Sequence, residues 1–554
     1  MVSALLDVFV GLLLAIVVLA TDPVVNSRDD AGPRPLPYEV APCRKGTIIE
    51  CGIFKVPLDW HEPSVGNGSI VFARYPAANQ TARKGTVFLH TGVSSWFSPD
   101  RAPQVDLSRQ AGALYTRLNG EYDLVMWIPR GRGVPGISIP GMLSCFADSV
   151  DKSDYYQDMT ERWSESPPGW DGATFEWTRQ QTVDDALLFH QIQERVVISC
   201  LETADDQGQG GMLRYVGTAA TVRDLVAMAD AFDGPDAPIR FWGAQPGSLV
   251  GSYLQKLFPE RAGRLVMDDP IDPIAYNAVP SYLTWQTAIA IANNTVATLE
   301  ESCASDELAD CSFPSGPPRP DMEFLGLSVR LLRQDLMGWR NQPFLDLLNS
   351  RYHQFYDAVR KDEKDTQNWQ TFEEHTERLN RYPVHDPAAL GLGDMPIICG
   401  DALDEHSDNK TLLAAVETVL TESLHSVPLL MPSAFPSWRF LCHLWPIRAI
   451  ERISFSEPQE QKPVQETLVL LRKLDPWNYP RVSDSAAREL WPDAHVFSDL
   501  EFGQYMFDHN NCNLDLIASF LANGTVPEEA FPCQDGDERR HPSQIPHTRH
   551  RRAH

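Results

Sequence analysis

Short apolar runs bounded by turn-forming residues recur along this sequence, and each has the length and composition of a β-strand inside a sheet. The runs cover 69–75, 86–90, 123–128, 239–242, 264–268 and 467–472. Between several of them, over 219–232 and 248–258, apolar residues recur at intervals of three and four, as on one face of an α-helix. A strand followed by a helix, repeated in this way, predicts a mostly parallel sheet with helices on both faces.

The alternation of strands and helices stops at about residue 280 and resumes at about residue 460. Between these points the pattern predicts long amphipathic helices over 325–348 and 355–381, joined by loops rich in proline. At 554 residues the chain is also longer than one hydrophobic core normally supports. We therefore expect 280–460 to be a helical cap inserted into a core that is built from 43–279 and 461–535.

Both ends of the chain are predicted to lie outside this core. Residues 1–20 predict a signal peptide, because their apolar run is shorter than the roughly 20 residues that span a bilayer and is followed at once by polar residues. The Pro-rich stretch 21–42 is expected to be an extended lead-in with no core of its own, so that regular structure begins near Cys43. Residues 536–554 are expected to be a basic, disordered tail without a functional role.

Cysteines and sequons indicate a secreted or lumenal protein without a stable membrane anchor. The ten cysteines are expected to form disulfides, because the sequence has neither a Cys-x-x-Cys pair nor a His-Glu-x-x-His motif, and we expect no metal and no cofactor. The cysteines are Cys43, Cys51, Cys145, Cys200, Cys303, Cys311, Cys399, Cys442, Cys512 and Cys533. The glycosylation sequons begin at Asn67, Asn79, Asn293, Asn409 and Asn523.

The charge of the chain limits the classes of partner that it is expected to bind. The formal net charge is −28 at pH 7, which argues against nucleic acid and anionic membranes, since phosphate binding needs clustered Lys and Arg. The expected partner is a small molecule or a peptide, held in a pocket at the carboxyl ends of the strands.

The segment Gly243-Ala-Gln-Pro-Gly247 stands where a predicted strand runs directly into a predicted helix. In a nucleophile elbow, two flanking glycines permit a strained turn that lifts the central side chain above the sheet, beside the N-terminal amides of the next helix. Here Gln245 occupies the tip, where serine hydrolysis requires a serine.

Further motifs accompany this elbow along the chain. They are Val56-Pro-Leu-Asp-Trp60, Pro129-Arg-Gly-Arg-Gly133, Gly217-Thr-Ala219, Phe258-Pro-Glu-Arg261, Asp272-Pro273, Cys399-Gly-Asp401 and Leu474-Asp-Pro476. With them, most of the mature chain resembles the prolyl iminopeptidase and tripeptidyl aminopeptidase branch of the α/β-hydrolases, which are secreted enzymes of fungi and bacteria. The resemblance implies an α/β-hydrolase fold, an inserted cap and a TAP-like C-terminal region.

Carried over residue by residue, the resemblance places Gln245 on the family's serine, Asp475 on its aspartate and Gln504 on its histidine. The family's glycine-rich oxyanion loop falls on His90-Thr-Gly-Val-Ser-Ser-Trp96, which keeps one glycine and is bulkier. The residues expected to line the pocket and this loop are His90, Thr91, Gly92, Trp96, Gly243, Pro246 and Gly247. A glutamine amide supplies no alkoxide and is not basic enough to accept a proton at neutral pH, so the sequence predicts the loss of acyl-enzyme chemistry.

Together with cysteine spacing, the resemblance also implies a set of local disulfides. The expected pairs are Cys43–Cys51, Cys145–Cys200, Cys303–Cys311, Cys399–Cys442 and Cys512–Cys533.

Three serine and histidine residues are candidates to replace the missing nucleophile or base, and one aspartate has an open role. The segment Gly136-Ile-Ser138 lacks the second elbow glycine and a following helix, and Ser248 lies inside the helix after the tip, where it would point elsewhere. His509 either replaces the missing base or is an ordinary surface histidine. Asp475 has either a catalytic role or only a structural one at the end of a strand.

Three functional hypotheses follow. The first is a non-hydrolytic enzyme, such as a cyclase or isomerase in natural-product biosynthesis, whose preorganised polar pocket needs no covalent intermediate. The second is a pseudoenzyme that binds a peptide or small ligand, and the third is a hydrolase with an unrecognised nucleophile. In the first two, Gln245 and Gln504 would face the bound molecule as hydrogen-bond donors and acceptors.

Overall fold

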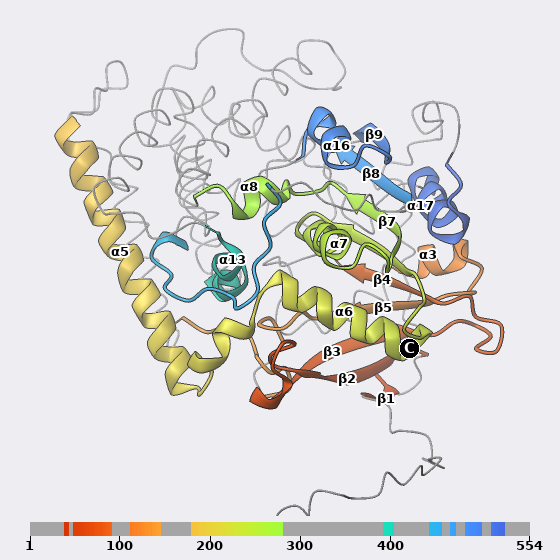
Figure 1. Ribbon diagram of the computed structural model, residues 1–554, viewed down its shortest axis with the longest axis horizontal. Coiled ribbons are helices and arrows are strands. Elements are labelled where there is room, and N and C mark those ends of the chain that lie inside the picture. Colours follow the sequence, from red (N-terminus) through yellow and green to blue (C-terminus); the bar gives the residue numbers. More distant parts are fainter. Residues whose placement is uncertain are drawn as a thin grey trace, which may run out of the picture. The chain divides into compact units, whose positions relative to one another are not determined.

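A nine-stranded β-sheet forms the centre of the described structure (Figure 1). The structure is a computed structural model, and the residues it describes are 38–43, 48–90, 111–133, 136–145, 179–280, 392–403, 442–456, 466–472, 482–500 and 511–526. The strands are β1 (Tyr38–Pro42), β2 (Glu50–Pro57), β3 (Asn67–Tyr75), β4 (Thr86–His90), β5 (Asp123–Trp127), β6 (Ile239–Ala244), β7 (Ala262–Asp268), β8 (Glu466–Arg472) and β9 (His495–Leu500). Their order across the sheet is β1-β2-β3-β5-β4-β6-β7-β8-β9.

The sheet is parallel except at one edge. The pairs β1–β2, β2–β3 and β3–β5 are antiparallel, and every pair from β5 to β9 is parallel. The six strands predicted from the hydrophobic pattern are present as β3 to β8, with ends that differ from the prediction by no more than two residues. The mostly parallel sheet expected from the sequence is therefore confirmed.

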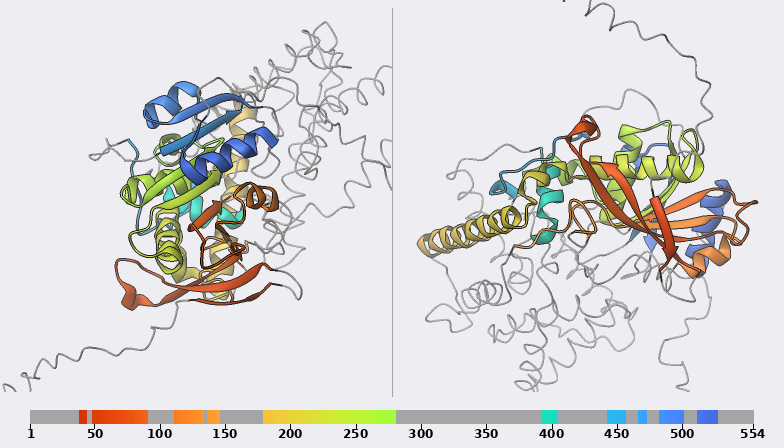
Figure 2. Two further views of the ribbon diagram at one scale, coloured as in Figure 1. Left: turned by 90° about the vertical axis from the view of Figure 1, so that its right-hand side faces the viewer. Right: turned by 90° about the horizontal axis from the view of Figure 1, so that it is seen from below.

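The central strands are apolar on both faces because helices cover both faces. All five residues of β4 are buried, and so are all five of β5. On one face, Phe88 packs with α6 (Thr218–Asp233), α7 (Pro246–Leu257) and α16 (Asp484–Leu490). On the other face, Val87 packs with α3 (Gly112–Arg117) and α17 (Asn511–Asn523). Figure 2 shows these two helical layers with the sheet between them.

The strand β1 corrects the predicted start of the folded core. The stretch 21–42 was expected to have no core of its own, yet residues 38–42 pair with β2 along their whole length. The ring of Tyr38 explains the difference, because it packs against Phe54, Phe72 and Phe232 at centroid distances of 6.0, 5.7 and 5.0 Å. One aromatic side chain thus attaches a Pro-rich segment to the edge of the sheet.

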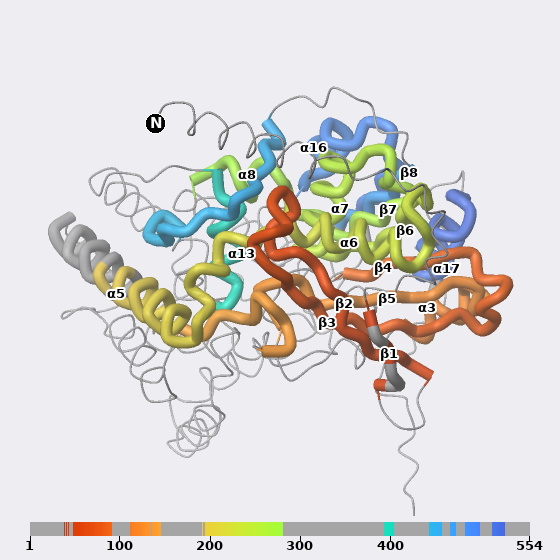
Figure 3. Tube along the Cα trace, turned by 60° about the horizontal axis from the view of Figure 1, so that its bottom comes forward, coloured from red at the N-terminus to blue at the C-terminus, as the bar shows by residue number. Residues whose placement is uncertain are grey.

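A third apolar cluster lies beside α6 and α7 and joins segments that are far apart in the sequence. It contains residues of α5 (Arg179–Asp206), η2 (Gly210–Tyr215), α8 (Pro273–Asn277), α13 (Met395–Asp401) and the segment 442–447. Figure 3 shows α5 and α13 at the same side of the sheet. Two short 3₁₀ helices, η1 (Pro63–Val65) and η5 (Leu392–Asp394), complete the described elements.

Three disulfides belong to the described part of the chain. They are Cys43–Cys51, Cys145–Cys200 and Cys399–Cys442, which are three of the five expected pairs. Cys512 is also disulfide-bonded, while Cys303, Cys311 and Cys533 lie outside the described residues. Across the described ranges, no helix combines the length and apolar character needed to cross a membrane.

Only 392–403 and 442–456 of the expected cap belong to the described residues, so the helical cap at 280–460 stays a prediction. The same holds for the signal peptide at 1–20 and the tail at 536–554, which lie outside those residues.

Candidate functional site

The turn between β6 and α7 has the strained geometry expected of an elbow. Gln245 adopts φ 50° and ψ −120°, in the positive-φ region that residues with a side chain rarely adopt. Such a conformation costs on the order of 1–3 kcal/mol and persists only where the surroundings hold it. Here the N–H of Gln245 donates to the carbonyl oxygen of Asp268 at 2.8 Å, and its own carbonyl accepts from the N–H of Ser248 at 2.9 Å.

The glycine before the tip is required by close backbone contact. A Cβ atom at Gly243 would lie 2.4 Å from the carbonyl oxygen of Gly247, so any larger residue would push the strand end away from the first turn of α7. A strained tip residue between these two glycines, on a strand-turn-helix unit of a mostly parallel sheet, decides the fold. This chain has the α/β-hydrolase fold.

Comparison with known proteins agrees with this α/β-hydrolase assignment. Residues 431–533, which include β8, α16, β9 and α17, match the family model of TAP-like proteins, as the sequence predicted for the C-terminal region. Among solved structures, an acetylester hydrolase from Corynebacterium glutamicum is similar at 11% identity and a TM-score of 0.29, over 82% of this chain and 87% of that chain. Acetyl xylan esterase 1 from a Thermoanaerobacterium species is similar at 10% identity and a TM-score of 0.29, over 88% of each chain. Scores this low carry no argument, so the agreement rests on the family model alone. No curated protein matches the sequence.

The residue after the tip adds a second departure from hydrolase chemistry. Pro246 is the first residue of α7, and proline has no backbone N–H. In α/β-hydrolases, the N–H of the residue after the nucleophile is one of the donors of the oxyanion hole. The elbow of this chain therefore has glutamine at its tip and, at the next position, a residue that cannot donate a backbone hydrogen bond. The prediction from sequence named Pro246 only as a pocket residue, although the missing N–H can be read from the sequence.

Ser248, the nearest hydroxyl to the tip in the sequence, is not a displaced nucleophile. Its side chain is fully buried, its Oγ donates to the carbonyl oxygen of Gln245 at 2.6 Å, and the N–H of Ile271 donates to it at 3.0 Å. Ser138 of the rejected near-elbow is also buried and is not followed by a helix within the described residues 136–145. The contacts of Ser248 fit its exclusion from the sequence, whereas the segment that follows residue 145 lies outside the described residues, so the exclusion of Ser138 stays a prediction.

A small cavity lies beside the elbow. It measures about 10 Å³, which is about the least that holds one water molecule. It is lined by His90, Pro129, Thr218, Thr221, Pro246, Leu249, Val250, Tyr276, Ile397 and Ile398. The walls come from β4, α6, α7, α8 and α13. The cavity therefore lies between the sheet and the third apolar cluster.

His90 ends β4 next to the elbow, because it pairs in register with Gly243 of β6. Burial, and then the positive charge of Arg132, lower the pKa of His90 to about 3. The imidazole is therefore neutral at physiological pH. Its ring lies 4.5 Å from that of Trp127, edge to face. A group with such a low pKa is a poor general base near neutral pH, which favours an orienting role over proton transfer.

Arg132, whose charge acts on His90, belongs to a buried ion pair. Arg132 approaches the carboxylate of Asp394 at 2.7 Å, and both side chains are buried. Burial raises the pKa of Asp394 to about 6, while the charge of Arg132 opposes this rise. Asp394 immediately precedes α13, so the pair connects the turn after β5 to the start of that helix.

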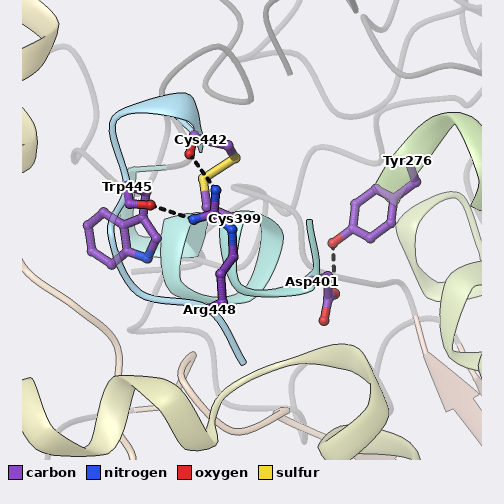
Figure 4. Close-up of a disulfide and its surroundings, with 6 residues drawn as sticks. All are labelled: Tyr276, Cys399, Asp401, Cys442, Trp445 and Arg448. Carbon is purple, nitrogen blue, oxygen red and sulfur yellow. Dashed lines mark hydrogen bonds between the residues drawn. A yellow bond between two sulfur atoms is a disulfide. The ribbon is translucent and has the colours of Figure 1, made fainter. Parts of the chain in front are cut away.

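The other end of α13 carries a second buried acid, Asp401 (Figure 4). Its carboxylate accepts from the N–H of Thr218 at 2.8 Å, from the hydroxyl of Thr218 at 2.5 Å and from the phenol of Tyr276 at 3.0 Å. Burial raises the pKa of Asp401 to about 6, and these hydrogen bonds oppose the rise. Asp401 thereby caps the start of α6 and fixes two residues of the cavity wall.

The same helix is held by the Cys399–Cys442 disulfide (Figure 4). Beyond it, the guanidinium of Arg448 donates to the carbonyl oxygens of Trp445 and Cys442. Because Ile397 and Ile398 of α13 line the cavity, this disulfide fixes the cavity wall.

The structure brings together only part of the predicted site. Gln245, Gly243, Pro246, Gly247 and His90 meet at the carboxyl ends of β4 and β6. The remaining predicted site residues, Thr91, Gly92, Trp96, Asp475 and Gln504, lie outside the described residues together with His509. Their roles stay predictions.

Three of the five predicted glycosylation sites belong to the described part, and Asn67, Asn79 and Asn523 are all exposed there. Asn293 and Asn409 lie outside it. In the same part of the chain, no group of His, Cys, Asp and Glu residues is arranged to hold a metal ion.

Proposed function

We propose that this α/β-hydrolase-fold protein binds a small molecule or peptide beside its elbow and does not hydrolyse it. The observation that carries the proposal is the pair Gln245 and Pro246, since the tip has no nucleophile and the next residue has no N–H for an oxyanion. Loss of a catalytic serine alone costs about a millionfold in the rate of a serine protease. In an enzyme that keeps its serine, loss of one oxyanion donor costs a factor of about 100 to 1,000.

The first candidate is a non-covalent enzyme of the cyclase or isomerase type, acting in natural-product biosynthesis. The strain at Gln245 supports a working side chain, because glycine would fit φ 50° at less cost and the chain keeps a side chain there. An amide at this position can donate to one ligand atom and accept from another. Orientation by fixed dipoles requires no covalent intermediate.

The second candidate is a binding protein without turnover, and the cavity wall supports it. The hydroxyls of Thr218 and Tyr276 both donate to Asp401, and that of Thr221 donates to the carbonyl oxygen of Gly217. These groups are already used within the protein, and His90 is neutral. The described wall therefore offers shape and apolar contact more than acid–base chemistry.

The proposal includes export of the protein through the secretory pathway. The disulfides support an oxidising compartment, and the exposed sequons support passage through the secretory pathway. A secreted or lumenal ligand is then expected.

The proposal is tested by a fluorophosphonate probe, which should leave the purified full-length protein unlabelled while labelling a serine aminopeptidase of the same fold under identical conditions. Stoichiometric labelling of any serine would disprove the non-hydrolytic proposal. Mass spectrometry of a co-purified ligand, followed by chromatography after incubation with fresh protein, separates the two candidates. A new isomer or cyclised product identifies an enzyme, and an unchanged ligand identifies a binding protein.

A further inference from the structure

The hydroxyl of Ser248 makes two hydrogen bonds at the elbow, although this serine is not placed as a nucleophile. It lies in the first turn of α7, three residues after the tip, and is fully buried. Its hydroxyl donates to the carbonyl oxygen of Gln245 at 2.6 Å and accepts from the N–H of Ile271 at 3.0 Å. One hydroxyl group therefore joins the elbow turn to the loop that follows β7.

That loop is itself tied to the next strand. The N–H of Asp269 donates to the carbonyl oxygen of Leu470, two residues before the end of β8, at 2.7 Å. The N–H of Gln245 also donates to the carbonyl oxygen of Asp268, the last residue of β7. The peptide group before the tip is thus held by the end of β7, and the peptide group after the tip is held, through Ser248, by the loop that follows β7.

The bracing matters because the tip is strained. A residue with a side chain at φ 50° relaxes toward negative φ unless its surroundings prevent it. Relaxation would swing the side chain at position 245 away from the first turn of α7. A donor fixed on the carbonyl of this residue opposes the rotation of the peptide group that relaxation requires.

We infer that Ser248 is a positioning residue, whose hydroxyl holds the elbow in the conformation that presents the side chain at position 245 to the ligand site. The inference rests on the proposed function, because only that proposal says that the side chain at position 245 contacts a ligand. The geometry itself can be tested without any ligand.

The same helix provides a matched control. Ser252 lies one turn further along α7 and is also buried, but its hydroxyl donates to the carbonyl oxygen of Ser248 at 3.2 Å. This is a local bond within the helix, and losing it leaves the tip untouched. Removal of the Ser248 hydroxyl instead leaves the N–H of Ile271 without this acceptor.

The test introduces a reporter thiol at the tip. Gln245→Cys is prepared in the full chain alone and together with Ser248→Ala, Ser248→Thr or Ser252→Ala, and the rate of iodoacetamide alkylation at position 245 is measured against pH by peptide mapping. Beside the N-terminus of α7, the introduced thiol should titrate about one unit below its ordinary pKa near 8.5. Ser248→Ala should return the pKa of this thiol toward 8.5 and slow alkylation at pH 7 by about tenfold. Ser252→Ala should change the rate by less than about twofold.

Ser248→Thr keeps a hydroxyl and should retain the lowered thiol pKa, which also covers the case in which Ser248→Ala does not fold. Equal thiol pKa values and rates in Ser248→Ala and Ser252→Ala would overturn the inference. A folded Ser248→Thr protein with the raised thiol pKa would overturn it as well. Failure of the non-hydrolytic proposal would appear in fluorophosphonate labelling of the unaltered chain, which is a separate measurement.

Discussion

Restoring hydrolysis in this protein should require a change at Pro246 in addition to the triad. Gln245→Ser and Gln504→His together would rebuild the two triad members that the family resemblance identifies as missing. The proline would still leave the elbow without its oxyanion donor. We therefore expect this double variant to react slowly, and Pro246→Ala in the same background to accelerate it.

The size of the effect follows from the lost hydrogen bond. One backbone donor to a developing oxyanion contributes roughly 3 kcal/mol, which is a factor of about 100 in rate. Pro246→Ala also loosens the unfolded chain, so its cost in folding stability should be about 0.5–1 kcal/mol. Activity should thus rise while stability falls slightly, a combination that a general improvement in folding cannot produce.

The assay is the second-order rate of fluorophosphonate labelling, with hydrolysis of an amino-acid p-nitroanilide as a second readout. Pro273→Ala is the matched control, because Pro273 also stands in the first turn of a helix, α8, and is buried. It should leave the labelling rate of the double variant unchanged. Labelling of the double variant within about twofold of the triple variant would show that Pro246 is not the limiting lesion.

Other consequences can be checked independently. Gln245→Gly should raise the free energy of unfolding by about 1 kcal/mol in urea titrations, because relief of strain exceeds the entropy cost of glycine; an equal or lower value would contradict the strain argument. Because burial raises the pKa of Asp401 to about 6, the folded state binds its proton more tightly than the unfolded chain, so this group's contribution to stability falls as pH rises from about 4 to 6. Asp401→Asn should remove up to about 3 kcal/mol of that fall, and an unchanged pH profile would refute the assignment. The opposite sign holds for His90, whose pKa is lowered to about 3, so His90→Phe should remove stability that is gained as pH rises to about 6.5. Non-reducing peptide mapping should find Cys512 joined to Cys533, and any other partner would correct the pairing.

The hydrophobic pattern predicted the parallel half of the sheet well, because strands buried on both faces are continuous apolar runs such as 86–90 and 123–127. It missed β1, β2 and β9. In β2, buried and exposed residues alternate, but the exposed Ile53 is apolar and the buried Gly52 has no side chain, so the alternation does not appear in the hydrophobic pattern. The strand β1 depends on Tyr38 reaching aromatic partners distant in sequence.

The sequence contains the motifs behind the family resemblance, but it does not reveal which contacts their residues make. The structure joins Trp60 and Arg130, from two separate motifs, on one buried carboxylate, that of Asp224. Thr218 and Asp401, from two others, meet at the start of α6. Such contacts cross up to 183 positions of the chain, so periodicity and spacing cannot reveal them. These motifs are mainly connections between elements, which explains how they accompany an elbow without a serine.

The adjacency of Gln245 and Pro246 has a consequence for how such a protein changes over generations. A mutation that returned serine to the tip would meet a proline beside it, and a mutation that replaced the proline would meet a glutamine. Under the proposed non-hydrolytic function, neither change alone would yield a useful catalyst, so a gain of hydrolysis would require at least two mutations. A lineage that acquires both residues is therefore free to refine a different use of the same elbow.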